Sequence, residues 1–89
     1  MVHRASADFW KSYDALPVEI RGGADKQFEL LKADPQYPSL RFKKIGDREG
    51  HELWSARITL KYRALAIKLG DEFLWFWIGE HGVYDNLIS

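Results

Sequence analysis

The sequence predicts a single α+β domain, residues 1–89, in which an N-terminal two-helix hairpin packs on a four-stranded, mainly antiparallel, twisted sheet. Two observations lead to this fold class. Apolar residues recur at helical intervals up to Ala33, and after Pro38 they alternate or run continuously as in β-strands. Short polar breaks containing glycine or proline separate these segments. An 89-residue chain that is 46% hydrophobic can bury one compact core.

The helical hairpin is predicted from two apolar stripes. The first stripe consists of Phe9, Trp10, Tyr13 and Leu16. The second consists of Ile20, Ala24, Phe28 and Leu31. Asp8 lies in the first turn of the first helix, where a negative charge interacts favourably with the helix dipole. Pro17 suits the first position of the second helix, because its missing N–H is tolerated there. Gly22-Gly23 lowers helix propensity, which leaves a later start near Ala24 open, and Pro35 ends the helix.

Four strands are expected in the second half of the chain: residues 39–45, 51–60, 62–69 and 72–79. Gly70-Asp71 suits a two-residue hairpin turn between the last two strands. The last strand is apolar on both faces, which indicates a central or doubly covered strand. Its Trp75 and Trp77 are expected to share one side and to be core residues rather than base-stacking platforms. The first five residues could add a short strand, supported only by Val2 and Ala5.

The formal charge of zero at pH 7 hides an uneven distribution of charged residues. Residues 41–68 carry eight lysines and arginines against three acidic residues, whereas residues 69–89 carry four acidic residues and no lysine or arginine. A basic segment in a neutral chain favours a localised anionic partner over general affinity for nucleic acid. The alternative is that these side chains only solvate exposed strand faces.

The composition argues against several classes of protein. The chain has no cysteine for a disulfide, and His3, His51 and His81 lack metal-ligand spacing, so no metal site is expected. No apolar run approaches the roughly 20 residues of a membrane helix, and the N-terminus has no signal-peptide core. A cytoplasmic domain with no membrane association and no small-molecule cofactor is therefore expected.

Candidate site residues lie at comparable places on the consecutive predicted strands. They are Lys43 and Lys44 on the first strand, Arg57 on the second, Arg63 on the third, and His81 and Tyr84 after the fourth. Arg57 is expected on the face opposite Trp54. Lys43 and Lys44 point to opposite faces of a regular strand, so one of them reaches a common site, and Lys44 is favoured.

This combination of residues suits RNA cleavage without a metal ion. Arginines contact phosphate and stabilise the charge that develops on the phosphorane. A histidine or a lysine can transfer protons, and a tyrosine can stack on an unpaired base. Structural interpretations remain open for each residue. Arg63 could form an ion pair with Glu80 or Asp85, His81 could bond a backbone carbonyl, and the ring of Tyr84 could pack on the sheet.

Three segments, "DPQYPSLRFKKI", "LWSARITLKYRALAI" and "WIGEHGVYDNLI", resemble in order and spacing the RelE/ParE superfamily of bacterial toxin–antitoxin toxins. The resemblance spans residues 15–88. It is strongest at Arg57, at the Tyr62-Arg63 pair, and at His81 and Tyr84. It implies a two-helix, antiparallel-sheet fold and a partner antitoxin. The RelE-like branch cleaves mRNA on the ribosome without a metal, whereas the ParE-like branch poisons DNA gyrase.

The resemblance also implies roles for single residues. It makes Arg57, Arg63, His81 and Tyr84 the candidate catalytic residues. It makes Lys43, Lys44, Arg41 and Lys61 the candidate RNA-binding residues. Ribosome and mRNA would be the other partners. The chain departs from the pattern in its neutral charge, in the absence of glycine from "RITLKYR", and in its acidic and apolar end "DNLIS". A non-nucleolytic member, gyrase-directed or inactive but antitoxin-binding, and an RNA-binding module without catalysis are the alternatives.

Overall fold

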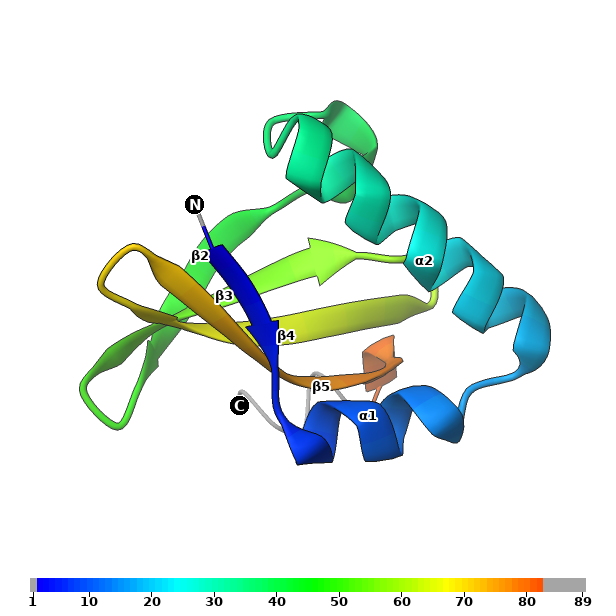
Figure 1. The fold of residues 1–89 in the computed structure, drawn as a ribbon, viewed down its shortest axis with the longest axis horizontal. Helices are drawn as coiled ribbons and strands as arrows, with labels where there is room; N and C mark the ends of the chain where they lie inside the picture. The colour runs from blue at the N-terminus through cyan, green and yellow to red at the C-terminus, as the bar shows by residue number, and fades with distance from the viewer. Residues whose placement is uncertain (1, 83–89) are drawn as a thin grey trace.

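The computed structural model describes residues 2–82 as two α-helices, one short 3-10 helix and five β-strands (Figure 1). In chain order these are β1 (Val2–Ala5), α1 (Ala7–Asp14), α2 (Val18–Ala33), η1 (Pro38–Leu40), β2 (Lys43–Arg48), β3 (His51–Arg57), β4 (Tyr62–Leu69) and β5 (Glu72–Glu80). The α+β class and the helical hairpin at the N-terminal side of the sheet are confirmed. No helix in this part of the chain is long and apolar enough to cross a membrane.

The five strands form one sheet in the order β1-β5-β4-β3-β2, so the prediction of four strands was wrong. Strands β2 to β5 are an antiparallel meander, and β1 adds to β5 in parallel, from Val2 opposite Glu72 to Ala5 opposite Trp75. A strand of four residues shows too little alternation to be recognised from sequence. Its pairing is determined by the backbone groups along the outer edge of β5, which would otherwise lack partners.

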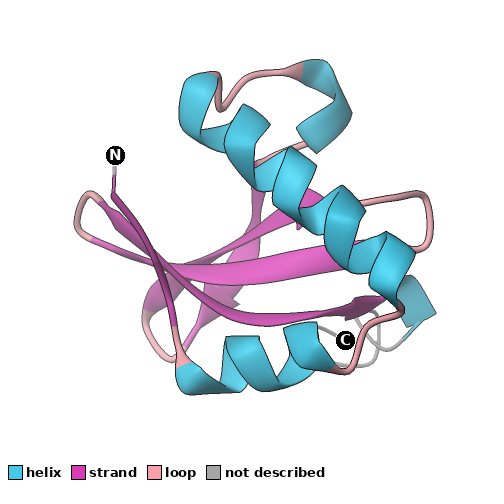
Figure 2. Ribbon diagram, turned by 45° about the vertical axis from the view of Figure 1, so that its right-hand side comes forward, coloured by secondary structure: helices cyan, strands magenta, loops and turns pink. Residues whose placement is uncertain are grey.

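Helix α1 runs beside β5, as Figure 2 shows. Ser6 caps its first turn, because the Ser6 hydroxyl accepts a hydrogen bond from the Phe9 N–H at 3.2 Å. A second serine joins the helix to the sheet, since the Ile78 N–H donates to Ser12 Oγ at 3.1 Å. The helix therefore holds β5 in place near its C-terminal end.

Helix α2 begins at Val18, before the glycine pair, so the later start near Ala24 is excluded. The carbonyl of Pro17 accepts hydrogen bonds from the N–H groups of Ile20 and Arg21, both at 3.0 Å. These bonds form the first turn despite the low helix propensity of the glycines that follow. The helix ends at Ala33, ahead of Pro35, as predicted.

The strands differ from their predicted bounds near the basic segment. Residues 38–40 form a 3-10 turn and Arg41 has a positive φ of 43°, so the extended strand begins only at Lys43. At the other end of the hairpin, β3 ends at Arg57 because the N–H groups of Ile58 and Thr59 both bond to the Tyr62 carbonyl. The predicted Gly70-Asp71 turn is present, with a φ of 65° at Gly70.

The two faces of the sheet are packed differently. The helix-side face carries the main core: Leu16, Ala24, Leu31, Leu40, Ala56, Ala64, Ala66, Phe73, Trp75 and Ile78. The opposite face, here called the helix-free face, carries a smaller cluster: Leu53 and Leu65, with Ile45, Phe76 and Trp77 packed against them. No helix of residues 2–82 covers the helix-free face.

Two β-bulges decide which side chains reach each face. In β5, Trp75 pairs with Ala66 and Trp77 pairs with Leu65, so Phe76 is an extra residue. Trp75 consequently lies in the helix-side core and Trp77 on the helix-free face, and the expectation that they share one side was wrong. A second bulge in β2 makes Ile45 the extra residue. An alternation rule alone fails at both places, because each bulge reverses the pattern that follows it.

Candidate functional site

The centre of the candidate site is a row of residues across three neighbouring strands. Arg57 of β3 lies directly opposite Arg63 of β4, which in turn lies opposite Gly79 of β5. Directly opposed residues in antiparallel strands point to the same face. That face is the helix-free one, because Arg63 is two positions from Leu65, a member of the smaller cluster. The prediction that Arg57 and Trp54 point to opposite faces of the sheet is confirmed, since Trp54 packs on the helix-side core.

Arg57 is half-buried, and its guanidinium makes no hydrogen bond or ion pair with any residue of the described range 2–82. Its backbone is nevertheless fixed. The Nε2 amide of Gln27 donates to the Arg57 carbonyl at 2.8 Å, which ties the end of β3 to α2. The helix therefore holds the backbone of Arg57, while its cationic group is available to an anion.

Arg63 is held by the loop that joins β3 to β4. Its Nη1 donates to the backbone carbonyls of Thr59 at 2.6 Å, Tyr62 at 3.0 Å and Leu60 at 3.4 Å. These charge-assisted hydrogen bonds stabilise a turn that contains no glycine. The alternative ion pair with Glu80 does not fit the register, because Glu80 lies opposite Tyr62 on the other face.

The β2 register brings Lys43, and not Lys44, to the face of Arg57. Lys43 lies opposite Ser55, two positions from Arg57, and it is exposed. Lys44 lies opposite Trp54 on the helix side, and its Nζ is 3.6 Å from Asp47 Oδ1. The sequence favours Lys44 for the common site, and the structure places Lys43 there.

Arg48 also lies on the helix-free face, where the sequence did not lead us to expect it. Its guanidinium lies 4.9 Å from the centre of the Phe76 ring, although β2 and β5 are separated by two strands. This contact shows that the sheet curls toward the helix-free face. The bulge at Ile45 turns Arg48 onto this face, so no alternation pattern could have assigned it there.

The remaining predicted residues lie around this row or away from it. His81 is exposed and lies beside the β3–β4 loop, because its backbone N–H donates to the Lys61 carbonyl. Lys61 is exposed in the same loop. Arg41 follows η1 in a left-handed conformation, outside β2, so the sheet register does not align it with Arg57. Tyr84 and the proposed ion-pair partner Asp85 lie outside the described residues.

Gly79, at the end of the arginine row, is covered by an aromatic side chain. A Cβ added at Gly79 would lie 2.5 Å from Cζ2 of Trp77, which is closer than real Cβ contacts come. The indole therefore occupies the space over Gly79, beside Arg63. Trp77 is partly exposed there.

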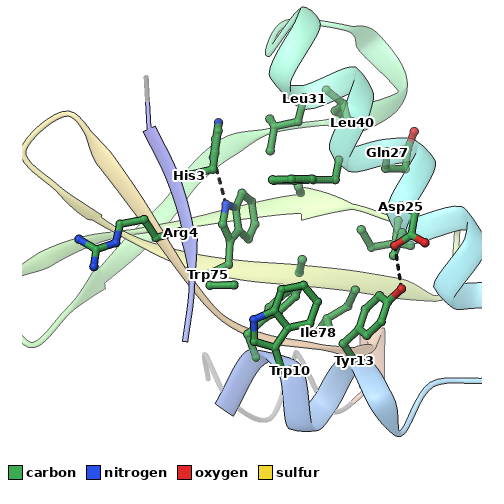
Figure 3. A pocket seen from close by; sticks show the side chains of 17 residues that line it. His3, Arg4, Trp10, Tyr13, Asp25, Gln27, Leu31, Leu40, Trp75 and Ile78 are labelled. Carbon is green, nitrogen blue, oxygen red and sulfur yellow. Dashed lines mark hydrogen bonds between the residues drawn. The ribbon is translucent and has the colours of Figure 1, made fainter. Parts of the chain in front are cut away.

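An apolar cavity of about 210 Å³ lies on the helix side, between α1, α2 and the sheet (Figure 3). At one end the Trp75 indole N–H donates to His3 Nδ1 at 3.0 Å, and burial lowers the pKa of His3. At the other end the Tyr13 hydroxyl donates to Asp25 Oδ1 at 2.8 Å, which raises the pKa of Tyr13. The cavity and the arginine row lie on opposite faces of the sheet.

Neither a protein-family model nor a curated protein matches the sequence of this chain. Solved structures do match it in fold. The RelB–RelE antitoxin–toxin complex from Methanococcus jannaschii aligns with a TM-score of 0.72 at 17% identity, over 97% of this chain and 99% of that chain. The RelE–RelB complex from Pyrococcus horikoshii gives 0.69 at 14%, over 91% and 94%. The YoeB/ParE toxin from Agrobacterium tumefaciens gives 0.65 at 15%, over 91% and 99%.

These alignments cover nearly the whole of each chain, so the similarity concerns the complete domain and not one motif. At such low identities they establish the fold. The chain has the fold of the RelE and YoeB/ParE toxins, as the resemblance of its sequence segments implies.

Proposed function

We propose that this chain is the toxin of a type II toxin–antitoxin pair and acts as a ribosome-dependent, metal-independent mRNA endoribonuclease. One observation carries the proposal. Arg57 and Arg63 lie side by side on the helix-free face, next to the loop that positions Lys61 and His81. The Arg57 guanidinium has no partner among residues 2–82 and can contact an RNA phosphate.

The reaction supported by these groups is attack of a ribose 2′-oxygen on the adjacent phosphodiester. The 2′-oxygen forms a bond to phosphorus while the bond from phosphorus to the 5′-oxygen breaks, giving a cyclic 2′,3′-phosphate and a 5′-hydroxyl. Arg57 would bind the non-bridging oxygens and stabilise their developing charge. A base removes the 2′-hydroxyl proton and an acid protonates the leaving 5′-oxygen, and His81 and Tyr84 are the candidates.

Arg63 has a positioning role in this proposal. Its hydrogen bonds to the β3–β4 loop hold the end of β3, and therefore Arg57, in a fixed place. Lys43, on the same face, would extend the cationic surface along the RNA backbone. Lys61 lies on the other side of the row, in the loop beside His81.

The proposed protein partner is a cognate antitoxin. Two of the three structures compared above are complexes of a RelE toxin with its RelB antitoxin, and the fold similarity extends over nearly all of each RelE chain. This supports the same kind of partner for the present chain. The ribosome and mRNA are proposed as further partners on the basis of the cationic row alone.

A non-nucleolytic toxin, directed at gyrase or inactive but still antitoxin-binding, is the second candidate. It is favoured by the three carbonyl contacts of Arg63, which give this arginine a structural use, and by the neutral overall charge. In that case the fold and the antitoxin partner would remain, and no new mRNA ends would form.

Induced expression followed by mapping of mRNA 5′ ends tests the proposal. The wild type should arrest growth and generate new 5′-hydroxyl ends, and Arg57→Ala should abolish both. Arg4→Ala is a matched control, because Arg4 is an exposed arginine on β1 that pairs with Glu72 at 3.5 Å, away from the row. Growth arrest without new ends would reject the nuclease and favour gyrase, and supercoiling-dependent DNA breaks would confirm that target.

A further inference from the structure

Trp77 lies on the same face as the arginine row. Its indole is only partly buried in the fold, and the proposed cleavage step gives it no role. We propose that this ring is a stacking platform for one unpaired base of single-stranded RNA. The inference rests on the proposed function for the choice of RNA as the ligand. It adds that an unpaired base of the RNA is held, and that Trp77 is the residue that holds it.

The bulge at Phe76 is the first step of the argument. If β5 paired regularly through Phe76, Trp77 would lie two positions after Trp75 on the same side and enter the helix-side core. The bulge instead turns Trp77 to the face that carries Arg57 and Arg63. β-Bulges are over-represented beside functional sites, where they re-aim one side chain.

Gly79 supplies the second step. The indole extends along β5 over this glycine, and Gly79 lies directly opposite Arg63. The ring is therefore in line with Arg63 and Arg57, across three strands that are spaced by about 4.8 Å. From Arg57 to Gly79 this is about 10 Å, so a phosphate at Arg57 and a neighbouring base at Trp77 can be held together.

The hydrogen bonds of the tryptophans supply the third step. The indole N–H of Trp54 donates to Glu52 Oε1 at 3.0 Å, and that of Trp75 donates to His3 at 3.0 Å. The N–H of Trp77 donates to no residue within the described range, although the ring is partly buried. This N–H is not buried, so a phosphate or base oxygen that reaches the helix-free face could accept a hydrogen bond from it.

An unpaired base is the ligand that this combination of groups fits. Every base has a π-face, so an aromatic platform next to cations binds single strands with little dependence on sequence. Paired bases in a duplex present no open face to such a ring. The structural alternative is that Trp77 only extends the cluster around Leu65 and binds nothing.

Binding of a short RNA that cannot be cleaved, because its riboses are 2′-O-methylated, discriminates between these two roles. Trp77→Leu should weaken binding about tenfold, equivalent to ~1.4 kcal/mol, and Trp77→Phe should retain most of the affinity. Trp10→Leu should bind like the wild type, because Trp10 is exposed on α1. Removing one base from the RNA should weaken binding to the wild type and leave binding to Trp77→Leu unchanged. Equal sensitivity of both proteins to base removal would overturn the proposal.

A second measurement avoids the substitution altogether. In wild-type protein labelled with fluorotryptophan, the fluorine resonance of Trp77 should move when the RNA is added, while those of Trp54 and Trp75 stay in place. An unmoved Trp77 resonance at saturating RNA would overturn the proposal, as would a wild type that binds no RNA. Loss of the cleavage function would appear separately, as RNA binding that depends on Trp77 without new mRNA ends in the expression assay.

Discussion

Arg57 and Arg63 are directly opposed on β3 and β4, yet only Arg63 donates to the backbone of the loop between them. Two cations in opposed positions on one face repel each other. The sheet keeps both, and the hydrogen bonds of Arg63 offset part of that repulsion. The two residues should therefore respond differently to replacement.

Arg57→Ala is expected to leave the free energy of unfolding unchanged or to raise it by a few tenths of a kcal/mol, about 0.2–0.5, because it removes the repulsion from Arg63. Urea unfolding followed by circular dichroism measures this. The same variant should lose mRNA cleavage in cells. A drop of several kcal/mol in the free energy of unfolding would show that the Arg57 side chain has a structural role and that its charge is not available to a ligand.

Arg63→Met keeps most of the apolar stem of the side chain and removes its hydrogen bonds to the loop carbonyls. The expected loss is about 1–2 kcal/mol in the free energy of unfolding, because part-buried carbonyls of the loop lose their donor. Hydrogen exchange should speed up at the Tyr62 amide, which bonds to Thr59 within this loop. Lys61→Met is the control, since the Lys61 side chain is exposed in the same loop. Equal losses for the two variants would contradict this explanation.

His3 makes the stability depend on pH. Burial lowers its pKa below the ordinary value of 6.5, so the folded protein holds fewer protons than the unfolded chain near that pH. Its stabilising contribution is complete above 6.5 and is lost as the pH falls through 6.5 toward the folded-state value. Thermal unfolding between about pH 7.5 and about pH 5 should show a declining midpoint.

His3→Gln is the matched test of this dependence, because its amide oxygen can still accept from the Trp75 indole while the side chain does not titrate. Its midpoint should decline less than that of the wild type. His51→Gln, at an exposed histidine, should follow the wild-type curve. Parallel curves for all three proteins would assign the pH dependence to other groups.

Gly79→Ala should displace Trp77, since the new Cβ would lie 2.5 Å from Cζ2 of its ring. A loss of about 1–3 kcal/mol is expected from this overpacking. In the Trp77→Leu background the same Gly79 substitution should cost much less, because the smaller side chain does not reach over position 79. Urea unfolding of the two single variants and the double variant measures the coupling. Additive effects would mean that the indole does not cover Gly79.

Sequence reasoning identified most of the fold because periodicity and turn residues mark the long elements clearly. It failed where the backbone departs from a regular pattern. The short strand β1 depends on a parallel pairing with β5, residues distant in the chain, and no local signal specifies that pairing. The bulges at Ile45 and Phe76 are likewise invisible to an alternation rule, although each changes the face of every residue that follows.

The same distinction explains the outcome for the candidate site. Arg57 and Arg63 flank one short loop, so their juxtaposition could be predicted from spacing. The choice between Lys43 and Lys44 depended on where the strand begins, and the face on which Arg48 lies depended on the bulge. The three carbonyl acceptors of Arg63 could not be predicted, because a sequence does not show which backbone carbonyls an arginine guanidinium will reach.

The bulge at Phe76 lets β5 contribute a tryptophan to each face of the sheet within three residues. Trp75 and Ile78, on either side of the bulge, both pack in the helix-side core, whereas Trp77 and Gly79 lie on the helix-free face. One extra residue thus lets one indole fill the interior while the next stays partly exposed on the other face. Regular pairing of the same residues without the bulge would exchange the faces, turning Trp77 toward the helices and Ile78 away from them.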